Sequence, residues 1–317
     1  MTRACFLYNP AVGRFPLTRK RLAVLRERLY RLGIRTEVTC TKAPDRGATS
    51  LDLEGQDLLL IYGGDGTIHD VLGEAVKWKI PVGILPAGTA NVLARELGIP
   101  RHLEKAVDVV AAGTPARMTL GRAGPHHFHL MAGIGVDGYI LQKMRSGMKK
   151  TFGVASYWML GFQSFWSLPL RPFEVRFPDR SYRATFAVVS NCRRYGGHLL
   201  ITPRASVFED ALDVCLFTST NRSRFLRYLF GALTGRHVQY ADVVYRKARR
   251  VGMHGDPAIP VQLDGDVVGH LPMDFTTCSD AIQVIVPPAR RLGGQLARPE
   301  PGPGEPATDT TAKPARP

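Results

Sequence analysis

The stretch LLLIYGGDGTIHDV, residues 58–71, decides the fold. Five apolar residues, 58–62, run directly into Gly63-Gly64, which is typical of a strand buried on both faces of a parallel sheet. Glycines let the backbone approach an oxyanion, and their amides, with the N-terminus of the helix expected next, can bind it. A hairpin turn is the alternative, since Asp-Gly is a strong turn pair. The strand before the loop and the helical pattern after it favour a nucleotide phosphate loop, in which Asp65 would hold Mg²⁺ or orient a phosphate-bound water.

The same strand–turn–helix order occurs twice more in the first third of the chain. Residues 4–8 lead into NPAVG (9–13), and residues 82–85 lead into a second loop that contains GTAN (88–91). Loops at the carboxyl ends of neighbouring parallel strands line one crevice. We therefore predict a doubly wound α/β domain over residues 1–120 whose three glycine-bearing loops enclose a nucleotide.

The pattern of apolar and polar residues changes after about Met118. Short apolar or alternating runs separated by turn residues predict a largely antiparallel β domain over residues 121–289, with helical inserts at 151–167 and about 221–233. The expected strands are residues 128–132, 173–177, 184–189, 212–217, 259–263 and 282–286. From residue 290 the chain is rich in proline and poor in bulky apolar residues, so the tail 290–317 is predicted to be disordered.

The charge balance predicts an anionic partner. Lys and Arg number 42 against 27 Asp and Glu, a formal net charge of +15, which suits nucleic acid, an acidic membrane or a polyphosphate substrate. The basic run 246–250 is not surrounded by a nucleic-acid-binding module, so surface or lipid contact is preferred.

The uncharged, aromatic-rich segment 151–170 is interrupted by polar residues and proline, which favours a buried or interfacial helix over a membrane span. Five cysteines without a CxxC pair, and no apolar N-terminal signal, favour the cytoplasm.

Two further groups of residues could carry chemistry. Asp264-Gly265-Asp266 follows an apolar run and is either a hairpin turn or a pair of carboxylates for metal binding or acid–base catalysis. His126, His127 and His129 lie close together but lack a carboxylate or thiolate partner in the sequence, which weighs against a metal site there.

Together these motifs resemble the diacylglycerol kinase catalytic-domain family, which includes bacterial lipid kinases and sphingosine kinases. The resemblance covers about residues 3–288. It rests on NPAVG, GGDGTIHDV and GTANVLARELGIP in the first domain, and on GIGVDGYI (133–140), RRYGGHLLITPRA (193–205), EDALDV (209–214) and LDGD (263–266) in the second. It implies an ATP-binding α/β domain, a β-sandwich-like lipid-substrate domain, and an active site in the cleft between them. The implied enzyme is a lipid kinase, a transferase that moves the γ-phosphoryl group of ATP to a lipid hydroxyl.

The resemblance also implies roles for individual residues. Asp266 stands at the position of the catalytic base and Asp264 is the first acid of the same motif, which would assist through magnesium. A structural Mg²⁺ in the second domain would be bound by Ser206, Glu209 and the main-chain carbonyl of Ala211. The nucleotide-binding positions are Asn9, Pro10, Ala11, Val12, Gly13, Thr41, Gly64, Asp65, Gly66, Thr67, Ile68, His69, Asp70 and Thr89.

The chain departs from the family pattern at four places. Asp266 replaces the usual Glu and is one methylene shorter. Val92 stands where GTxND has an acid, and Glu209-Asp210 stands where Asp-Gly is common, which weighs against a metal there. Arg14 follows Gly13 where some relatives have lysine, and would substitute for it.

The implied partners are Mg-ATP and a lipid at an anionic membrane, with no nucleic acid. The protein would be peripheral on the inner face of the membrane, with Lys143, Arg145, Lys149 and Lys150 as the docking face. The acceptor lipid and the oligomeric state, a homo-oligomer included, are left open. Two alternatives remain: a soluble kinase of the NAD kinase type, since GGDGT also occurs there, and a catalytically silent lipid- or nucleotide-binding regulator.

Overall fold

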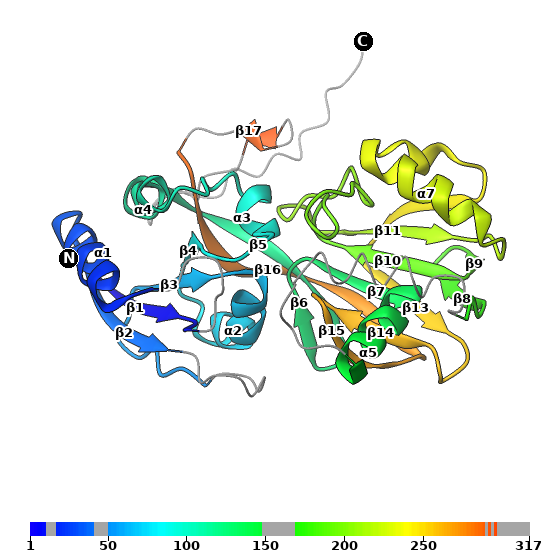
Figure 1. Cartoon of the computed structure of the whole chain (residues 1–317), viewed down its shortest axis with the longest axis horizontal. Coiled ribbons are helices and arrows are strands. Elements are labelled where there is room, and N and C mark those ends of the chain that lie inside the picture. Colours follow the sequence, from blue (N-terminus) through cyan, green and yellow to red (C-terminus); the bar gives the residue numbers. More distant parts are fainter. Residues whose placement is uncertain (11–16, 41–49, 148–168, 289–290, 293–294, 297–317) are drawn as a thin grey trace, which may run out of the picture.

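The computed structural model describes residues 1–10, 17–40, 50–147, 169–288, 291–292 and 295–296 (Figure 1). The predictions for Ala11, Val12, Gly13 and Thr41, for the segment 151–167 and for the tail beyond residue 296 lie outside the described residues. Within the described part, no helix combines the length and apolar content that crossing a bilayer requires.

Parallel strands in the order β2-β1-β3-β4 form the centre of the first lobe. The strands are β1 (Thr2–Tyr8), β2 (Ile34–Cys40), β3 (Leu58–Gly63) and β4 (Val82–Pro86). Every residue of β3 and β4 is buried, as the uninterrupted apolar runs predict for strands covered on both faces. The helices of this lobe are α1 (Arg19–Arg31), α2 (Asp65–Trp78), α3 (Val92–Glu96) and α4 (Leu103–Ala112).

Helix α1 shows how local sequence sets these boundaries. The Thr18 hydroxyl accepts a hydrogen bond from the Arg21 N–H at 3.3 Å and caps the N-terminus. Leu25 and Leu29 are buried against the sheet, and Gly33, with φ +84°, lets the chain turn directly into β2.

The second lobe consists of two layered sheets (Figure 1). One sheet has the order β12-β11-β10-β7-β14-β15, and the other continues the first lobe's sheet through β16-β13-β8-β9 with β5 and β6 alongside. Their facing side chains form one apolar core, which includes Phe128, Phe173, Val189 and Phe275. The strands are β5 (Thr114–Ala123), β6 (His126–Phe128), β7 (Met131–Gly135), β8 (Phe173–Arg176), β9 (Ser181–Ala184), β10 (Phe186–Ser190), β11 (Leu212–Phe217), β12 (Val243–Ala248), β13 (Arg250–His254), β14 (Pro260–Leu263), β15 (Asp266–His270) and β16 (Met273–Val286).

Strands β5 and β16 join the two lobes. They pair antiparallel from Thr114–Val286 at one end to Ala123–Phe275 at the other, and β16 also lies parallel to β4 where Val284 faces Val82. The sequence signal at residues 282–286 therefore marks only the end of a strand of 14 residues that completes the first lobe's sheet. Strand β5 runs across the boundary predicted at residue 120.

The remaining elements lie on the surface of these sheets. Helix α5 (Val136–Gly147) follows β7, α7 (Ser223–Thr234) follows β11, and the short 3-10 helix η3 (Arg236–Gln239) follows α7. Strands β17 (Arg291–Leu292) and β18 (Gln295–Leu296) form a separate antiparallel pair. The prediction of an α/β lobe followed by a β-sandwich-like lobe is confirmed.

Candidate active site

The glycine loops after β3 and β4 touch each other through their backbones. A Cβ atom on Gly88 would lie 2.5 Å from the Gly64 Cα, and one on Gly64 would lie 3.0 Å from the Gly88 Cα. Asn91 fixes the second of these loops, because its Oδ1 accepts from the Gly88 N–H at 2.9 Å and its Nδ2 donates to the Gly88 carbonyl at 2.8 Å. A side chain at either position would collide with the other loop, so the contact between Gly64 and Gly88 explains why both loops carry glycine.

The first loop meets the same edge of the sheet. The Asn9 N–H donates to the Tyr62 carbonyl and its side-chain amide donates to the Thr67 hydroxyl, each at 3.4 Å. Gly64 is the N-terminal cap of α2, so the positive end of this helix lies at the meeting point of the loops. Gly66 and Thr89 are exposed there. The structure thus brings together the described parts of all three predicted loops.

Ile68 does not contribute its side chain to this edge. The side chain is buried in the core, and its N–H donates to the Gly64 carbonyl as part of the first turn of α2. Ile68 holds the helix against the sheet and presents no group to a ligand.

Asp65 has a structural role that the sequence did not reveal. Its two carboxylate oxygens accept hydrogen bonds from the N–H groups of Val92 at 3.0 Å and Leu93 at 3.1 Å, at the start of α3. Burial raises the pKa of Asp65 and outweighs these hydrogen bonds, which act in the opposite direction. These two hydrogen bonds fix α3 and join the second glycine loop to the third, and the expectation that Asp65 holds Mg²⁺ or a phosphate-bound water stays a prediction.

Asp264-Gly265-Asp266 is a hairpin turn that also supplies buried carboxylate. It connects β14 to β15, and Asp264 and Gly265 have φ values of +49° and +98°. Two successive positive φ values are typical of the tight turns that join antiparallel strands. The Asp264 side chain is fully buried and accepts from the N–H groups of His129, Leu130 and Met131, each at 2.9 Å. The hairpin is thereby fixed to the segment that leads into β7.

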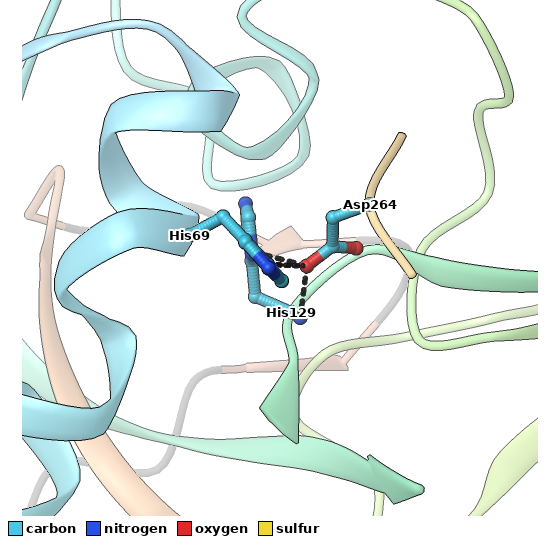
Figure 2. Close-up of side chains that lie close together, drawn as sticks. All are labelled: His69, His129 and Asp264. Carbon is cyan, nitrogen blue, oxygen red and sulfur yellow. Dashed lines mark hydrogen bonds and ion pairs between the residues drawn. The ribbon is translucent and has the colours of Figure 1, made fainter. Parts of the chain in front are cut away.

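Two histidines complete the surroundings of Asp264 (Figure 2). The His69 Nδ1 lies 2.9 Å from the Asp264 Oδ2 and forms a hydrogen bond with it. The His129 Nδ1 lies 2.8 Å from the same oxygen but outside hydrogen-bond geometry, so this contact is electrostatic. The three side chains come from α2, from the turn before β7 and from the hairpin, and so they join the two lobes.

These contacts shift the pKa values of the cluster. Burial raises the pKa of Asp264, but the charge of His129 and the hydrogen bond and charge of His69 outweigh it and hold the pKa far below its usual range. Burial lowers the pKa of His69, but its hydrogen bond to Asp264 and the charges of Asp264, Asp266 and Asp70 outweigh it, and the pKa is raised. Asp264 and His69 therefore each stabilise the charged form of the other.

Asp266 lies at the start of β15, half-buried and close enough to His69 to raise its pKa. Asp264 likewise acts on the pKa of Asp65. The hairpin therefore faces the N-terminus of α2, and the acidic residues of the second lobe share one site with the glycine loops of the first.

Helix α3 makes a further contact between the lobes that the sequence did not reveal. The Arg95 Nη1 donates to the Gly197 carbonyl at 2.6 Å, and the Arg193 Nε lies 2.9 Å from the buried Glu96 carboxylate. Both partners lie in the RRYGG stretch, residues 193–197. The third glycine loop is thus fixed from the second lobe as well as by Asp65.

The metal site implied for the second lobe does not fit the residues present. The Glu209 carboxylate is paired with the Lys247 ammonium, and the Ser206 hydroxyl accepts from the Phe208 N–H at 3.4 Å. A cationic side chain already lies where a cation would bind Glu209, so the prediction that Ser206, Glu209 and Ala211 bind Mg²⁺ is not supported.

Comparisons with known proteins agree with this architecture. Residues 3–123 match the family model described as the diacylglycerol kinase catalytic domain, and residues 131–286 match the YegS C-terminal NAD kinase beta sandwich-like domain. A diacylglycerol kinase from Bacillus subtilis (strain 168) is 30% identical over 295 residues, which cover 90% of this chain and 97% of the relative. One from Mycobacterium tuberculosis (strain ATCC 25618 / H37Rv) is 30% identical over 243 residues, covering 74% and 78%.

Solved structures show the same fold. The crystal structure of a putative diacylglycerol kinase from Bacillus anthracis str. Sterne superposes with a TM-score of 0.74 at 20% identity, covering 90% of this chain and 97% of that chain. A second structure from the same organism gives 0.72, also at 20% identity, with the same coverage. At this identity the likeness establishes the fold alone.

Proposed function

The chain belongs to the diacylglycerol kinase family, and from that premise we propose that it transfers the γ-phosphoryl group of ATP to the hydroxyl of diacylglycerol at an anionic membrane surface. The observation that carries the proposal is the contact between the hairpin 264–266 and the N-terminus of α2, made by the His69–Asp264 hydrogen bond. It brings carboxylates to the N-terminal turn of α2, a helix terminus that would bind phosphate. Phosphoryl transfer needs both, one to receive a proton and one to hold charge.

The glycine loops would bind the nucleotide. The exposed backbone at Gly66 and the positive end of α2 suit the phosphates, and Thr89 is exposed on the neighbouring loop. Mg²⁺ bound to the ATP phosphates would neutralise part of their charge. The half-buried carboxylate of Asp70 is an oxygen donor of the kind that Mg²⁺ prefers.

The two acids of the hairpin, Asp266 and Asp264, would have different roles. Asp266, half-buried at the edge of the site, would accept the proton of the lipid hydroxyl as it attacks. Asp264 is a positioning residue, because its carboxylate is used by three backbone N–H groups and by His69. His69 would keep the hairpin against α2 through its hydrogen bond to Asp264.

Labelled ATP tests the activity directly. Incubation of the protein with γ-labelled ATP, Mg²⁺ and vesicles containing diacylglycerol, a sphingoid base and ceramide should transfer the label to diacylglycerol, as separated by thin-layer chromatography. NAD⁺ added to a parallel sample tests the soluble-kinase alternative. Label in NADP⁺, or nucleotide binding without any labelled lipid, would contradict the proposal.

An exposed apolar stripe on α7 supports contact with a bilayer. Leu226, Phe230 and Leu233 are exposed at a spacing that places them on one face, while Tyr228 and Ala232 are buried on the other. Arginines flank the stripe at residues 222, 224, 227 and 236. An apolar stripe with basic neighbours suits the headgroup region of an anionic leaflet. Of the docking face predicted from the sequence, Lys143 is exposed, and the other three side chains lie outside the described part.

Phe230→Ser should weaken binding to vesicles that contain phosphatidylglycerol by about 5–30-fold, since inserting an aromatic ring of this size contributes roughly 1–2 kcal/mol. Vesicle sedimentation measures the change, and activity on a short-chain, soluble diacylglycerol should stay near the unmodified level. Val24→Ser on α1 is the matched control, because Val24 is 65% exposed and Phe230 68%. Equal losses from both variants would contradict docking through α7.

A further inference from the structure

The Lys247 ammonium lies among oxygen atoms of the second lobe. Lys247 lies on β12 directly opposite Asp213 of β11. Its ammonium contacts the Glu209 carboxylate, lies 3.4 Å from the Asp213 Oδ2, and donates to the Arg204 carbonyl at 3.3 Å. Two carboxylates and a main-chain carbonyl are the ligand types that Mg²⁺ and Ca²⁺ take in proteins. Here an ammonium group holds them together.

The buried carboxylate of Asp213 requires the positive charge of Lys247. The Asp213 side chain is only 1% exposed, and its Oδ1 accepts from the Tyr245 hydroxyl at 2.5 Å. Its Oδ2 has no hydrogen bond to any of the described residues, and the Lys247 ammonium is the cation paired with it. A buried carboxylate without a compensating charge is strongly destabilising.

The neighbouring acid does not compete for Lys247. The Asp210 carboxylate is paired with Arg249, whose Nη2 lies 2.6 Å from it. Lys247 is therefore matched with Glu209 and Asp213. One ammonium thus pairs with two carboxylates from different segments, the turn 209–211 and strand β11. That is the bridging role of a structural metal ion.

We propose that Lys247 is a built-in structural cation, which replaces the divalent ion implied at Ser206, Glu209 and Ala211 and lets this lobe fold without metal. The sequence of the implied ligands agrees with this replacement, since Glu209-Asp210 stands where the family commonly has Asp-Gly. The proposal concerns stability alone, so it stands or falls independently of the kinase activity.

Lys247→Met tests the proposal, because methionine keeps the apolar stem and removes the charge. Thermal unfolding is followed by circular dichroism in EDTA and then with rising millimolar Mg²⁺ or Ca²⁺, without nucleotide. The unmodified protein should unfold at the same temperature throughout. Lys247→Met should unfold about 5–10 °C lower in EDTA, and the divalent cation should restore part of that loss in a saturable way.

Two further variants identify the ligands. Lys247→Arg keeps the charge and should gain no dependence on the cation. Lys247→Met combined with Glu209→Gln removes an acidic ligand, so the cation should no longer restore stability. Saturable stabilisation of the unmodified protein by Mg²⁺, or a Lys247→Met variant indifferent to both cations, would overturn the proposal.

A binding measurement covers the case in which Lys247→Met does not fold. Mn²⁺ binding to the unmodified protein and to Glu209→Gln, counted by electron paramagnetic resonance without nucleotide, should be the same. One Mn²⁺ site lost on Glu209→Gln would show that Glu209 binds a metal in the presence of Lys247, and the proposal would be wrong.

Discussion

Asp266→Asn should lower the rate of lipid phosphorylation by about 10²–10⁴-fold, the range that a general base typically contributes. Asparagine has nearly the same shape as aspartate and cannot accept the proton of the attacking hydroxyl. The nucleotide affinity should change little, because the glycine loops belong to the other lobe. Initial rates with γ-labelled ATP and diacylglycerol vesicles give kcat, and fluorescence titration of a nucleotide analogue gives the affinity.

Asp266→Glu is the sharper companion, since it restores the carboxylate on the longer side chain that the family commonly carries. It should retain activity within about tenfold of the unmodified enzyme, as expected when the base is kept and only its reach changes. Asp274→Asn controls for loss of a surface acid, because Asp274 is about half exposed and pairs with Arg250. Full activity in Asp266→Asn would instead place the base elsewhere, and intact nucleotide binding with no turnover in the unmodified protein would favour the silent regulator.

The parts of the fold that the sequence predicted are those set by short-range signals. Residues 58–62 are apolar without a break and end in Gly63-Gly64, so strand and turn are both visible within a few residues. The run at 212–217 also coincides with β11, although Asp213 interrupts its apolar residues. The 128–132 run was less exact, since the chain divides there between β6 and β7.

The elements that were missed depend on distant partners. Strand β16 includes Thr276, Thr277 and Ser279, and its pairing with β5 shifts register between Cys278 and Ile282, so only its apolar end at 282–286 was recognised. Its position beside β4 links residues about 200 apart in the chain. Helix α5 was also missed, because its start lies in the glycine-containing GIGVDGYI motif.

The same distinction applies to the site. The residue types in the loops could be predicted from spacing, and so could the hairpin at 264–266. What each acid contacts could not, since Asp65 turns to the amides of Val92 and Leu93, and Asp264 to those of His129 and its neighbours. His129 stood in a cluster with His126 and His127 in the sequence, yet it is buried against Asp264, which lies 135 residues further along the chain.

Asp264→Asn should lower the free energy of unfolding by about 3–5 kcal/mol, the usual loss when one member of a buried charged network is removed. Asparagine tolerates the positive φ at this position, so the substitution tests the carboxylate and not the turn. Its amide group would face N–H donors and His69, leaving some of these buried groups without an acceptor. Urea unfolding followed by circular dichroism measures the difference.

The pH dependence of that difference identifies the charge as its cause. The pKa of Asp264 is depressed in the folded state, so its contribution is fully present above the unfolded pKa, about 3.9, and is lost as the pH falls toward the folded value. The gap between Asp264→Asn and the unmodified protein should therefore be constant from about pH 5 to 6 and shrink below about pH 4. Asp274→Asn, which breaks the exposed ion pair with Arg250, should lower the free energy of unfolding by at most about 1 kcal/mol. If Asp264→Asn lowers the free energy of unfolding no more than Asp274→Asn does, the hairpin is held to α2 by packing and not by the buried carboxylate.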